Sequence, residues 1–396
     1  MNVFQFIEQE EKRQRSTVNL IASENYASVA VRKAQGSVFT NKYAEGTPGK
    51  RYYSGCEVAD DMELYCQILW QRVFGTDYHV NVQPHSGSTA NLAAYLAVLK
   101  PGSTILSMEL SDGGHLSHGH KLSLSGMLYE IRHYGLKYDE TIDYEDLEAK
   151  VRHYLPSLVV VGASSYSRTI DFARIRAILD RVRTDALMEG RIYEPILMAD
   201  IAHIAGLVAA GVHPSPFGLA DIVTTTTHKT LRGARGGLIF CKQPLAAKID
   251  RAVFPGLQGG PLLHQIAGKA ATAEEALTPE YHEYIRNVVQ NAAKMAKVFS
   301  DLGYRVVSGG TDNHLFCLNL SEMGITGREA QQILAANGIL VNKNCVPNDQ
   351  KSPYETSGIR IGTPAMTTMG WTADDFTRCA LQIDRILREY IQKGDT

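Results

Sequence analysis

The stretch EPILMADIAHIAGLVAAGVHPSPFGLADIVTTTT (194–227) joins two apolar, β-branched runs, at 194–200 and 220–227, through a segment with helical periodicity. Runs of this kind are typical of strands that are buried on both faces of a sheet. Further runs of the same type stand at 103–109, 157–165 and 236–242. The intervals between most of the runs leave room for crossover helices, so the pattern predicts an α/β fold with a mainly parallel sheet.

The pattern changes after residue 262, where an Ala-rich helical stretch begins. It leads into short apolar runs that predict strands near 304–307, 314–320, 339–344 and 357–362. A final helical pattern covers 374–392. We therefore predict three parts, which are an N-terminal helical arm (1–38), a large α/β domain (39–262) and a smaller α+β domain (263–396).

The charge balance and the cysteines exclude several classes of protein. The 396 residues carry 40 Lys and Arg against 42 Asp and Glu, a formal charge of −2, so no net positive field attracts nucleic acid. The sequence shows neither an apolar stretch of the roughly 20 residues that a bilayer crossing needs nor a secretory signal. Six cysteines without a C-x-x-C pair argue against disulfides and structural zinc. We expect a cytoplasmic protein that binds neither nucleic acid nor membrane.

The most informative segment for chemistry is VTTTTHKTLRGARGG (223–237). Lys229 follows the end of a predicted buried strand, with His228 before it and glycine-rich backbone after it. Burial penalises an ammonium and lowers the pKa of the amine, which favours an imine with an aldehyde. A lone lysine at a strand end more often extends to solvent. The segment alone leaves both interpretations open.

Two other segments supply groups that suit a cofactor. Asp200 ends a predicted strand three residues before His203, at the edge where carboxyl ends of parallel strands open into a crevice. Its carboxylate can keep a pyridinium nitrogen protonated, or it can cap the following helix. Ser86, Gly87 and Ser88 directly precede a helical pattern, so the positive end of a helix can bind one phosphate there. Simple capping would place the same residue types at this position.

His115 lies in the glycine-rich loop LSDGGHLSHGH (110–120), where its flat ring can stack on an aromatic cofactor. The competing interpretation is a metal site made of Asp112 and the three histidines of this loop, His115, His118 and His120. No second group of ligands is apparent in the sequence. A lysine for an imine, a carboxylate for a ring nitrogen, a helix start for one phosphate and a ring to stack together predict a pyridoxal-phosphate site.

These segments resemble the serine hydroxymethyltransferase family, whose members are fold type I pyridoxal-phosphate enzymes similar to aspartate aminotransferase. VTTTTHKT (223–230) and KYAEGTPGKRYY (42–53) are the stretches most specific to that family. The other matching stretches follow the family's order along nearly the whole chain: NLIASENYAS (19–28), PHSGSTAN (84–91), GGHLSHG (113–119), DIAHIAGLVAAGV (200–212), FPGLQGGP (254–261), SGGTDNHLF (308–316), VNKN (341–344) and TSGIRIGTPA (356–365). The resemblance implies a large domain with a mainly parallel seven-stranded sheet and a smaller α+β C-terminal domain.

The resemblance also implies the roles of the cofactor-binding residues. Lys229 forms the imine with the cofactor, Asp200 pairs with the ring nitrogen, and His115 stacks on the ring. The phosphate is bound by Ser86, Gly87 and Ser88, together with Gly259 and Gly260 of the neighbouring subunit. The further cofactor contacts are Ser164, His203 and Thr226. His228 joins the catalytic group.

Substrate-binding roles come from the same resemblance. Arg360 binds the substrate carboxylate, since a guanidinium matches a carboxylate bidentately, although TSGIRIGT alone also fits a surface arginine. Tyr43 and Tyr53 reach across the interface of a homodimer with shared active sites. Glu45 moves protons, which requires burial to raise its pKa, or else pairs with Lys42, Lys50 or Arg51. Ser23 also lines the substrate pocket, and folate lies near Leu110, Gly114, Leu116, Tyr52 and Asn344.

The implied reaction is the reversible transfer of the hydroxymethyl group of L-serine to tetrahydrofolate, which gives glycine and 5,10-methylenetetrahydrofolate. The alternatives are a related enzyme that acts on an α-substituted serine, a folate-independent aldolase for β-hydroxy amino acids, and a catalytically silent cofactor-binding protein. Three positions depart from the family pattern, with Asp112 for His, Thr89 for Gln and Ala234 for Pro. We expect the Asp112 carboxylate to weaken the binding of anionic ligands unless it is paired or protonated.

Overall fold

Seven strands form the largest sheet of the protein. The computed structural model describes residues 1–394, and the order of the strands in this sheet is β4 (His79–Asn81), β10 (Gly237–Cys241), β9 (Ile222–Thr226), β8 (Ile196–Asp200), β7 (Leu158–Val161), β5 (Thr104–Met108) and β6 (Glu130–Tyr134). Strand β10 runs antiparallel to both neighbours, and the other ladders are parallel. The mainly parallel seven-stranded sheet is therefore confirmed.

The central strands are buried on both faces, as their apolar runs predicted. Every residue of β7, β9 and β10 is buried. On one face, helix α4 (Gly87–Val98) contributes Ala90, Ala93 and Ala94 to a cluster with Leu158 and Met198. Alanine side chains let the helix axis approach the sheet closely, so the start of α4 is fixed against the strand ends.

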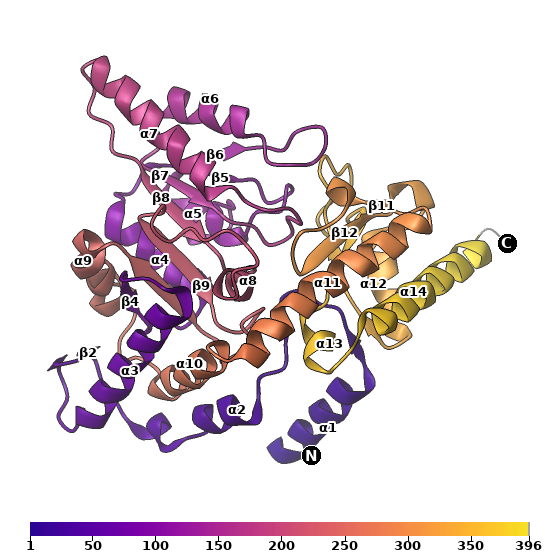
Figure 1. The fold of residues 1–396 in the computed structure, drawn as a ribbon, viewed down its shortest axis with the longest axis horizontal. Helices are drawn as coiled ribbons and strands as arrows, with labels where there is room; N and C mark the ends of the chain where they lie inside the picture. Colours follow the sequence, from indigo (N-terminus) through magenta and orange to yellow (C-terminus); the bar gives the residue numbers. More distant parts are fainter. Residues whose placement is uncertain (395–396) are drawn as a thin grey trace. The chain divides into compact units, whose positions relative to one another are not determined.

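Helices join the successive parallel strands, as parallel pairing requires. Helix α6 (Tyr144–Tyr154) joins β6 to β7, and α7 (Phe172–Met188) joins β7 to β8; the two helices pack side by side (Figure 1). The other helices of this part of the chain are α2 (Val29–Gln35), α3 (Glu57–Phe74), α5 (Leu124–Leu128), α8 (Ala205–Ala209), α9 (Ala246–Arg251) and α10 (Leu263–Ala276). A two-stranded hairpin precedes α3, with strands β2 (Gly46–Thr47) and β3 (Lys50–Arg51).

The chain divides into two compact units. The larger unit comprises Ala27–Ser164 and Thr169–Ile285, and it contains the seven-stranded sheet. The smaller unit comprises Met1–Tyr26, Ser165–Arg168 and the chain from Arg286 onward. The domain boundaries that we expected after residues 38 and 262 stay a prediction.

The smaller unit is built on a four-stranded antiparallel sheet. The order of its strands is β11 (Arg305–Val306), β12 (Leu315–Asn319), β15 (Gly358–Gly362) and β14 (Asn342–Asn344). Phe299, Phe316 and Phe376 belong to its apolar core. The remaining elements are α1 (Val3–Ser16), β1 (Val18–Asn19), α11 (Pro279–Asp301), which begins in the larger unit, α12 (Gly327–Ala336), β13 (Ile339–Leu340), α13 (Pro364–Thr368) and α14 (Ala373–Gly394).

The structure adds detail that the sequence pattern did not predict. The Ala-rich stretch after residue 262 forms two helices, because Pro279 begins α11 and cannot continue α10. Strand β6 was missed because it is an edge strand whose side chains are mostly polar and partly exposed. Strand β4 was missed because it has only three residues. Within residues 1–394, no helix has the length and apolar character to cross a membrane.

Candidate active site

Asp200 stands at the carboxyl end of β8, and three hydrogen bonds converge on its carboxylate. His118 Nε2 lies 2.8 Å from Oδ2, Asn91 Nδ2 donates to the same oxygen at 2.9 Å, and the Ala202 N–H donates to Oδ1 at 3.0 Å. Burial alone would raise the pKa of Asp200, but the hydrogen bond and charge of His118 outweigh it and hold the pKa well below its ordinary value. The carboxylate is therefore ionised at neutral pH. Asp200 does not cap the next helix, because the N-cap of α8 is Ile204.

A chain of hydrogen bonds joins Asp200 to His115. Asn91 Nδ2 also donates to Ser117 Oγ at 2.8 Å, and Ser117 Oγ lies 2.7 Å from His115 Nδ1. Since the Ser117 main-chain N–H also donates to Nδ1, this nitrogen is an acceptor, and a neutral ring carries its proton on Nε2. Thr224 Oγ1 donates to Asn91 Oδ1 at 2.7 Å. The ring and the carboxylate that we assigned to one cofactor thus belong to a single network.

The loop histidines do not gather as metal ligands. His118 directs Nε2 at Asp200 from a buried position, whereas His120 Nδ1 accepts a hydrogen bond from the Leu122 N–H. Among residues 1–394, no group of three or more potential ligand side chains is placed to hold a metal ion. The structure therefore gives no support to the metal site considered for His115, His118, His120 and Asp112.

Lys229 lies in the loop after β9, and threonine hydroxyls tie this loop to the one after β8. Thr230 Oγ1 donates to the His203 carbonyl at 3.0 Å, and Thr226 Oγ1 donates to the Ala202 carbonyl at 3.4 Å. His203 is buried, and Lys229 is partly buried. The threonine-rich run thereby holds the loops of Lys229 and His203 together at the edge where the two neighbouring strands end.

His228, directly before Lys229, is held neutral. Burial, and then the positive charges of Arg235 and Lys229, lower the pKa of His228 to about 3. The Nδ1 atom of His228 is buried and finds no hydrogen-bond partner among the described residues. Any part that His228 takes in proton transfer therefore starts from the neutral imidazole.

The start of α4 presents main-chain donors beside the loop after β9. Ser86 is the N-cap residue, and its Oγ accepts from the Thr89 N–H at 3.2 Å, which confirms the capping interpretation. A Cβ added to Gly87 would stand 2.6 Å from Thr226 Cγ2, so this approach needs a glycine. The first N–H groups of a helix have no partner inside the helix. Those of Gly87 and Ser88 are therefore suited to an anion.

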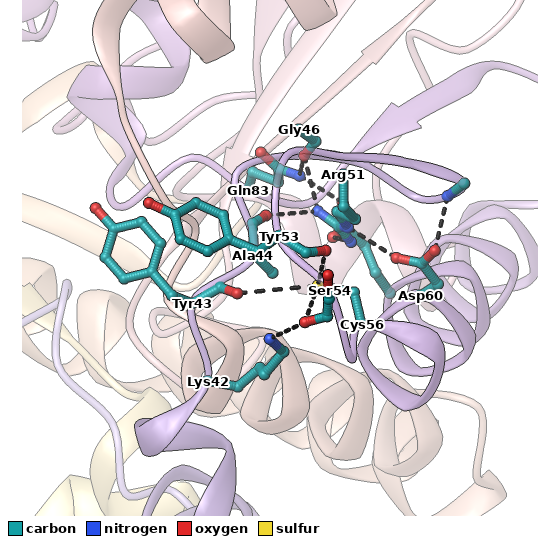
Figure 2. A network of polar contacts seen from close by, with 12 residues as sticks. Lys42, Tyr43, Ala44, Gly46, Arg51, Tyr53, Ser54, Cys56, Asp60 and Gln83 are labelled. Carbon is teal, nitrogen blue, oxygen red and sulfur yellow. Dashed lines mark hydrogen bonds and ion pairs between the residues drawn. The ribbon is translucent and has the colours of Figure 1, made fainter.

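A buried guanidinium holds the hairpin that carries Glu45. Arg51 Nη1 donates to the carbonyls of the two residues that flank Glu45, at 2.9 and 2.7 Å. Its Nε and Nη2 bind Asp60 and Glu63 of α3, at 2.7 and 2.6 Å. Figure 2 shows Arg51 between the hairpin and α3. Because Arg51 is paired in this way, the ion pair that we considered between Arg51 and Glu45 does not form.

Glu45 lies instead with two tyrosines and two glycines. The rings of Tyr43 and Tyr53 have centroids 4.9 Å apart (Figure 2). A Cβ on Gly259 would stand 3.1 Å from Glu45 Oε1, and one on Gly260 would stand 2.9 Å from the Tyr43 ring. We call these five residues the Glu45 group. The two tyrosines and two glycines, which the resemblance assigns to the far side of a dimer interface, thus lie together with Glu45 within one chain.

The loop after β5 exposes apolar side chains. Leu110 and Leu116 are 39% and 51% exposed, and Tyr52, which directly follows β3, is 76% exposed. Gly114 between the two leucines is buried, and its N–H donates to a main-chain carbonyl of the same loop at 2.9 Å. The Ser164 N–H donates to another carbonyl of this loop at 2.7 Å, which places Ser164 beside it. The folate-binding and cofactor-binding roles of these residues stay predictions.

Arg360 lies in β15 of the smaller unit. Its Nη2 donates to Oδ1 of Asn342, its register partner on β14, at 2.9 Å. The residue is only 9% exposed, so the interpretation as a surface arginine is wrong. Ser23 and Asn344 belong to the same unit and are partly buried.

Each of the three departures from the family pattern has a local structural context. Burial, and then the charge of Glu109, raise the pKa of Asp112 to about 6. Thr89 Oγ1 lies 2.9 Å from Ser86 Oγ, in the first turn of α4. The Ala234 N–H donates to Thr272 Oγ1 at 3.1 Å, a bond that a proline at this position could not make.

Sequence reasoning missed Asn91 and Ser117, considered His118 only as a metal ligand, and considered Arg51 only as a partner of Glu45. Asn91 follows Gly87 by four residues, so helical spacing places it on the same side of α4 as the proposed phosphate-binding turn. That spacing was the available signal for Asn91. Ser117 gave no comparable signal, because its contacts depend on the conformation of a loop.

Comparisons with known proteins identify the family of the chain. A family model described as serine hydroxymethyltransferase matches residues 1–383. A protein of Coprothermobacter proteolyticus named serine hydroxymethyltransferase is 52% identical over 394 residues, which cover 99% of this chain and 91% of the relative. One of the same name from Leuconostoc mesenteroides subsp. mesenteroides is 52% identical over 390 residues, covering 98% and 92%. Serine hydroxymethyltransferase 2 of Colwellia psychrerythraea is 53% identical over 377 residues, covering 94% and 88%. The chain therefore belongs to the serine hydroxymethyltransferase family.

Proposed function

We propose that the chain catalyses the reversible transfer of the hydroxymethyl group of L-serine to tetrahydrofolate, which gives glycine and 5,10-methylenetetrahydrofolate. The cofactor is pyridoxal 5′-phosphate. Relatives with the name of this activity cover nearly the whole chain. The observation that carries the proposal is the ionised carboxylate of Asp200, fixed by three donors at the edge of the sheet where β9 leads into the Lys229 loop.

The described residues fit pyridoxal phosphate. The anion of Asp200 favours the protonated form of a pyridine nitrogen, and the start of α4 favours a phosphate dianion. Lys229 provides the amine for the aldehyde. When bound, the cofactor supplies a conjugated ring that accepts electrons from a broken bond at the substrate Cα.

The residues of the chain have separate tasks toward the amino acid. Arg360 binds its carboxylate, because a buried guanidinium already oriented by Asn342 offers a preorganised fork. Glu45 holds or moves a proton at the hydroxyl oxygen of serine. Ser23 and Tyr53 orient the amino acid. Folate binds against Leu110, Leu116 and Tyr52, whose exposed apolar surface suits a flat aromatic ring. We also assign folate contacts to Gly114 and, in the smaller unit, to Asn344.

A homodimer with shared active sites is part of the proposal. Helix α3 buries Cys66 and Trp70 on one face and exposes Leu64 and Ile68 elsewhere. Exposed apolar side chains in a row on a long helix are typical of an interface. In a two-fold dimer, the Glu45 group of one subunit then serves Lys229 of the other. We also propose a cytoplasmic location, which fits six cysteine thiols because disulfides persist in oxidising compartments.

One assay separates the transferase from its alternatives. The purified protein with added pyridoxal phosphate is given L-serine with and without tetrahydrofolate, and glycine and methylenetetrahydrofolate are quantified. We expect rapid formation of both products only with tetrahydrofolate, and none from the Lys229→Ala variant.

Other outcomes of the assay identify other functions. Cleavage of allo-threonine without folate that is faster than the folate-dependent turnover of serine would indicate an aldolase. A preference for α-methylserine over serine would indicate the related enzyme that acts on an α-substituted serine. Binding of amino acids without any turnover would indicate a silent cofactor-binding protein. Each of these outcomes contradicts the proposed transfer.

A further inference from the structure

The segment that leads from β4 into α4 is held mainly by side chains. The β4–β10 ladder pairs residues up to Asn81. Beyond it, the Gln83 carbonyl accepts from Gln258 Nε2 at 3.0 Å, and the His85 N–H donates to Gln258 Oε1 at 3.0 Å. Buried main-chain groups need such partners once a ladder ends. The two carbonyls on either side of Gln83 are bound by a lysine.

Lys269 of α10 is that lysine, and it is 1% exposed. Its Nζ donates to the carbonyls of Val82 at 2.7 Å, Pro84 at 2.9 Å and Gly237 at 3.0 Å. An ammonium has three protons, and each of them is directed at one of these carbonyls. The side chain therefore joins the segment before α4 to the first residue of β10.

The neighbourhood is shaped around this side chain. A Cβ on Gly236 would stand 2.2 Å from Lys269 Cε, so the stem of the lysine passes over a residue that has room only as glycine. The Gly237 N–H donates to the Pro84 carbonyl at 3.0 Å. The Gly236 carbonyl accepts from the Thr227 N–H at 3.2 Å, two residues before Lys229. Lys269 thus holds the end of the Lys229 loop, at Gly237, against the segment that leads into α4.

Placing an ammonium here is energetically unfavourable unless all its protons are bound. Burial lowers the pKa of Lys269 to about 8, although Cys66 and Glu63 of α3 oppose this change. The other side chains on the buried face of α10 are mostly apolar or small, such as Leu263, Ile266 and Ala273. An apolar side chain at position 269 would avoid the cost of burying the charge, but it would leave three buried carbonyls without this donor.

We propose that Lys269 is a positioning residue for the phosphate end of the cofactor site. Its three hydrogen bonds set the path of residues 82–85, and this path decides where Ser86 Oγ and the first N–H groups of α4 point. Lys269 itself contacts main-chain carbonyls, and its effect on a ligand passes through α4. The inference rests on the proposed function, because it assigns the phosphate of pyridoxal phosphate to the start of this helix.

Two ligands that differ only in the phosphate test this role. The affinities of the cofactor-free protein for pyridoxal 5′-phosphate and for pyridoxal are measured by absorbance titration, for the wild type and for Lys269→Met. We expect Lys269→Met to bind pyridoxal phosphate about tenfold more weakly, as loss of ordered hydrogen bonds to an anion implies. Affinity for pyridoxal is expected to stay unchanged, so the ratio of the affinity for pyridoxal phosphate to the affinity for pyridoxal falls.

A matched control and a second variant keep the test decisive. Ile266→Ala, also buried and one turn earlier on α10, destabilises the same helix and is expected to leave the ratio unchanged. Gly236→Ala displaces the lysine stem without removing the charge and is expected to lower the ratio. If Lys269→Met does not fold, the Gly236→Ala variant tests the positioning role of Lys269 in its place.

The outcomes that contradict the inference are distinct from failure of the proposed function. Equal affinities of wild type and variants for pyridoxal phosphate, or an equal loss for both ligands, overturn the role of Lys269 alone. A wild-type protein that binds neither ligand overturns the proposed function and this inference together.

Discussion

Asn91 Nδ2 donates a hydrogen bond of 2.9 Å to Asp200 Oδ2, and the same amide nitrogen donates to Ser117 Oγ at 2.8 Å. One side chain on α4 therefore orients both the carboxylate at the end of β8 and, through Ser117, the ring of His115. The amide lies one helical turn from Gly87, at the proposed phosphate-binding turn. The residues proposed for the ring nitrogen, the ring face and the phosphate thus depend on the position of one helix.

Asn91→Ala tests this dependence. A hydrogen bond to a charged group contributes about 1.5–3 kcal/mol, and losing it makes Asp200 a weaker partner for a protonated ring nitrogen. We expect kcat for serine to fall roughly 10- to 100-fold at saturating cofactor. Asn291→Ala is the matched control, because Asn291 is also buried and donates to Thr367 Oγ1 in the smaller unit. An Asn91→Ala enzyme with the wild-type kcat would contradict the role of this network.

Asp112 gives a prediction about stability and pH. Burial and the charge of Glu109 raise the pKa of Asp112 from 3.8 to about 6 in the folded protein. The folded protein therefore favours the neutral carboxyl. The stability that this preference contributes is fully present below pH 3.8 and is lost as the pH rises through about 6.

At pH 8 the carboxyl is ionised, so we expect Asp112→Asn to stabilise the protein, by about 1 kcal/mol because the side chain is only partly buried. At pH 4 the carboxyl is neutral in the folded protein, so we expect little effect. Urea unfolding at both pH values measures the free energy of unfolding. Asp77→Asn, the same change at an exposed position, is the control. A variant that is less stable at pH 8 would show that the ionised carboxylate has a stabilising partner.

Arg360→Lys tests recognition of the amino acid. A lysine keeps the charge but loses the bidentate fork, so we expect the KM for serine to rise about tenfold or more, with the affinity for pyridoxal phosphate unchanged. Asn342→Ala removes only the amide that orients the guanidinium, and a smaller rise is expected. An unchanged KM in Arg360→Lys would remove Arg360 from the binding site.

Shared active sites predict that two inactive variants restore activity when their subunits exchange. Lys229→Ala lacks the amine and Glu45→Gln lacks the proton-transferring carboxylate, so each homodimer is expected to be inactive. A mixed dimer has one site in which both residues are intact, and unfolding and refolding the two variants together is expected to give roughly a quarter of the wild-type activity. No recovery, with mixed dimers demonstrated by mass spectrometry, would show that Glu45 and Lys229 of the same chain act together.

The sequence predicted the parts of the molecule that follow from hydrophobic periodicity and local motifs. Runs such as 157–165 and 220–227 are apolar because both faces of their strands are covered, and both form strands of the sheet. The family and the proposed activity followed from motifs that stay contiguous in the chain. Edge strand β6 was missed because an edge strand has less need of apolar side chains.

Contacts between distant segments were beyond sequence reasoning. Lys269 is separated by more than half of the larger unit's chain from the carbonyls of Val82 and Pro84, and a lysine on an amphipathic helix is normally expected at the surface. Asn91 meets Asp200 only because α4 packs on the sheet. Such pairs depend on the tertiary fold, which no local pattern encodes.

Borohydride reduction of the protein loaded with pyridoxal phosphate, followed by peptide mapping, tests the central claim most directly. Reduction fixes the cofactor to whichever amine has condensed with its aldehyde. We expect one phosphopyridoxyl group per chain on Lys229, and none on Lys269, the buried lysine with a lowered pKa. Label on Lys269 or another lysine, or a loaded protein without label on Lys229, would contradict the assignment of Lys229 and the roles built around it.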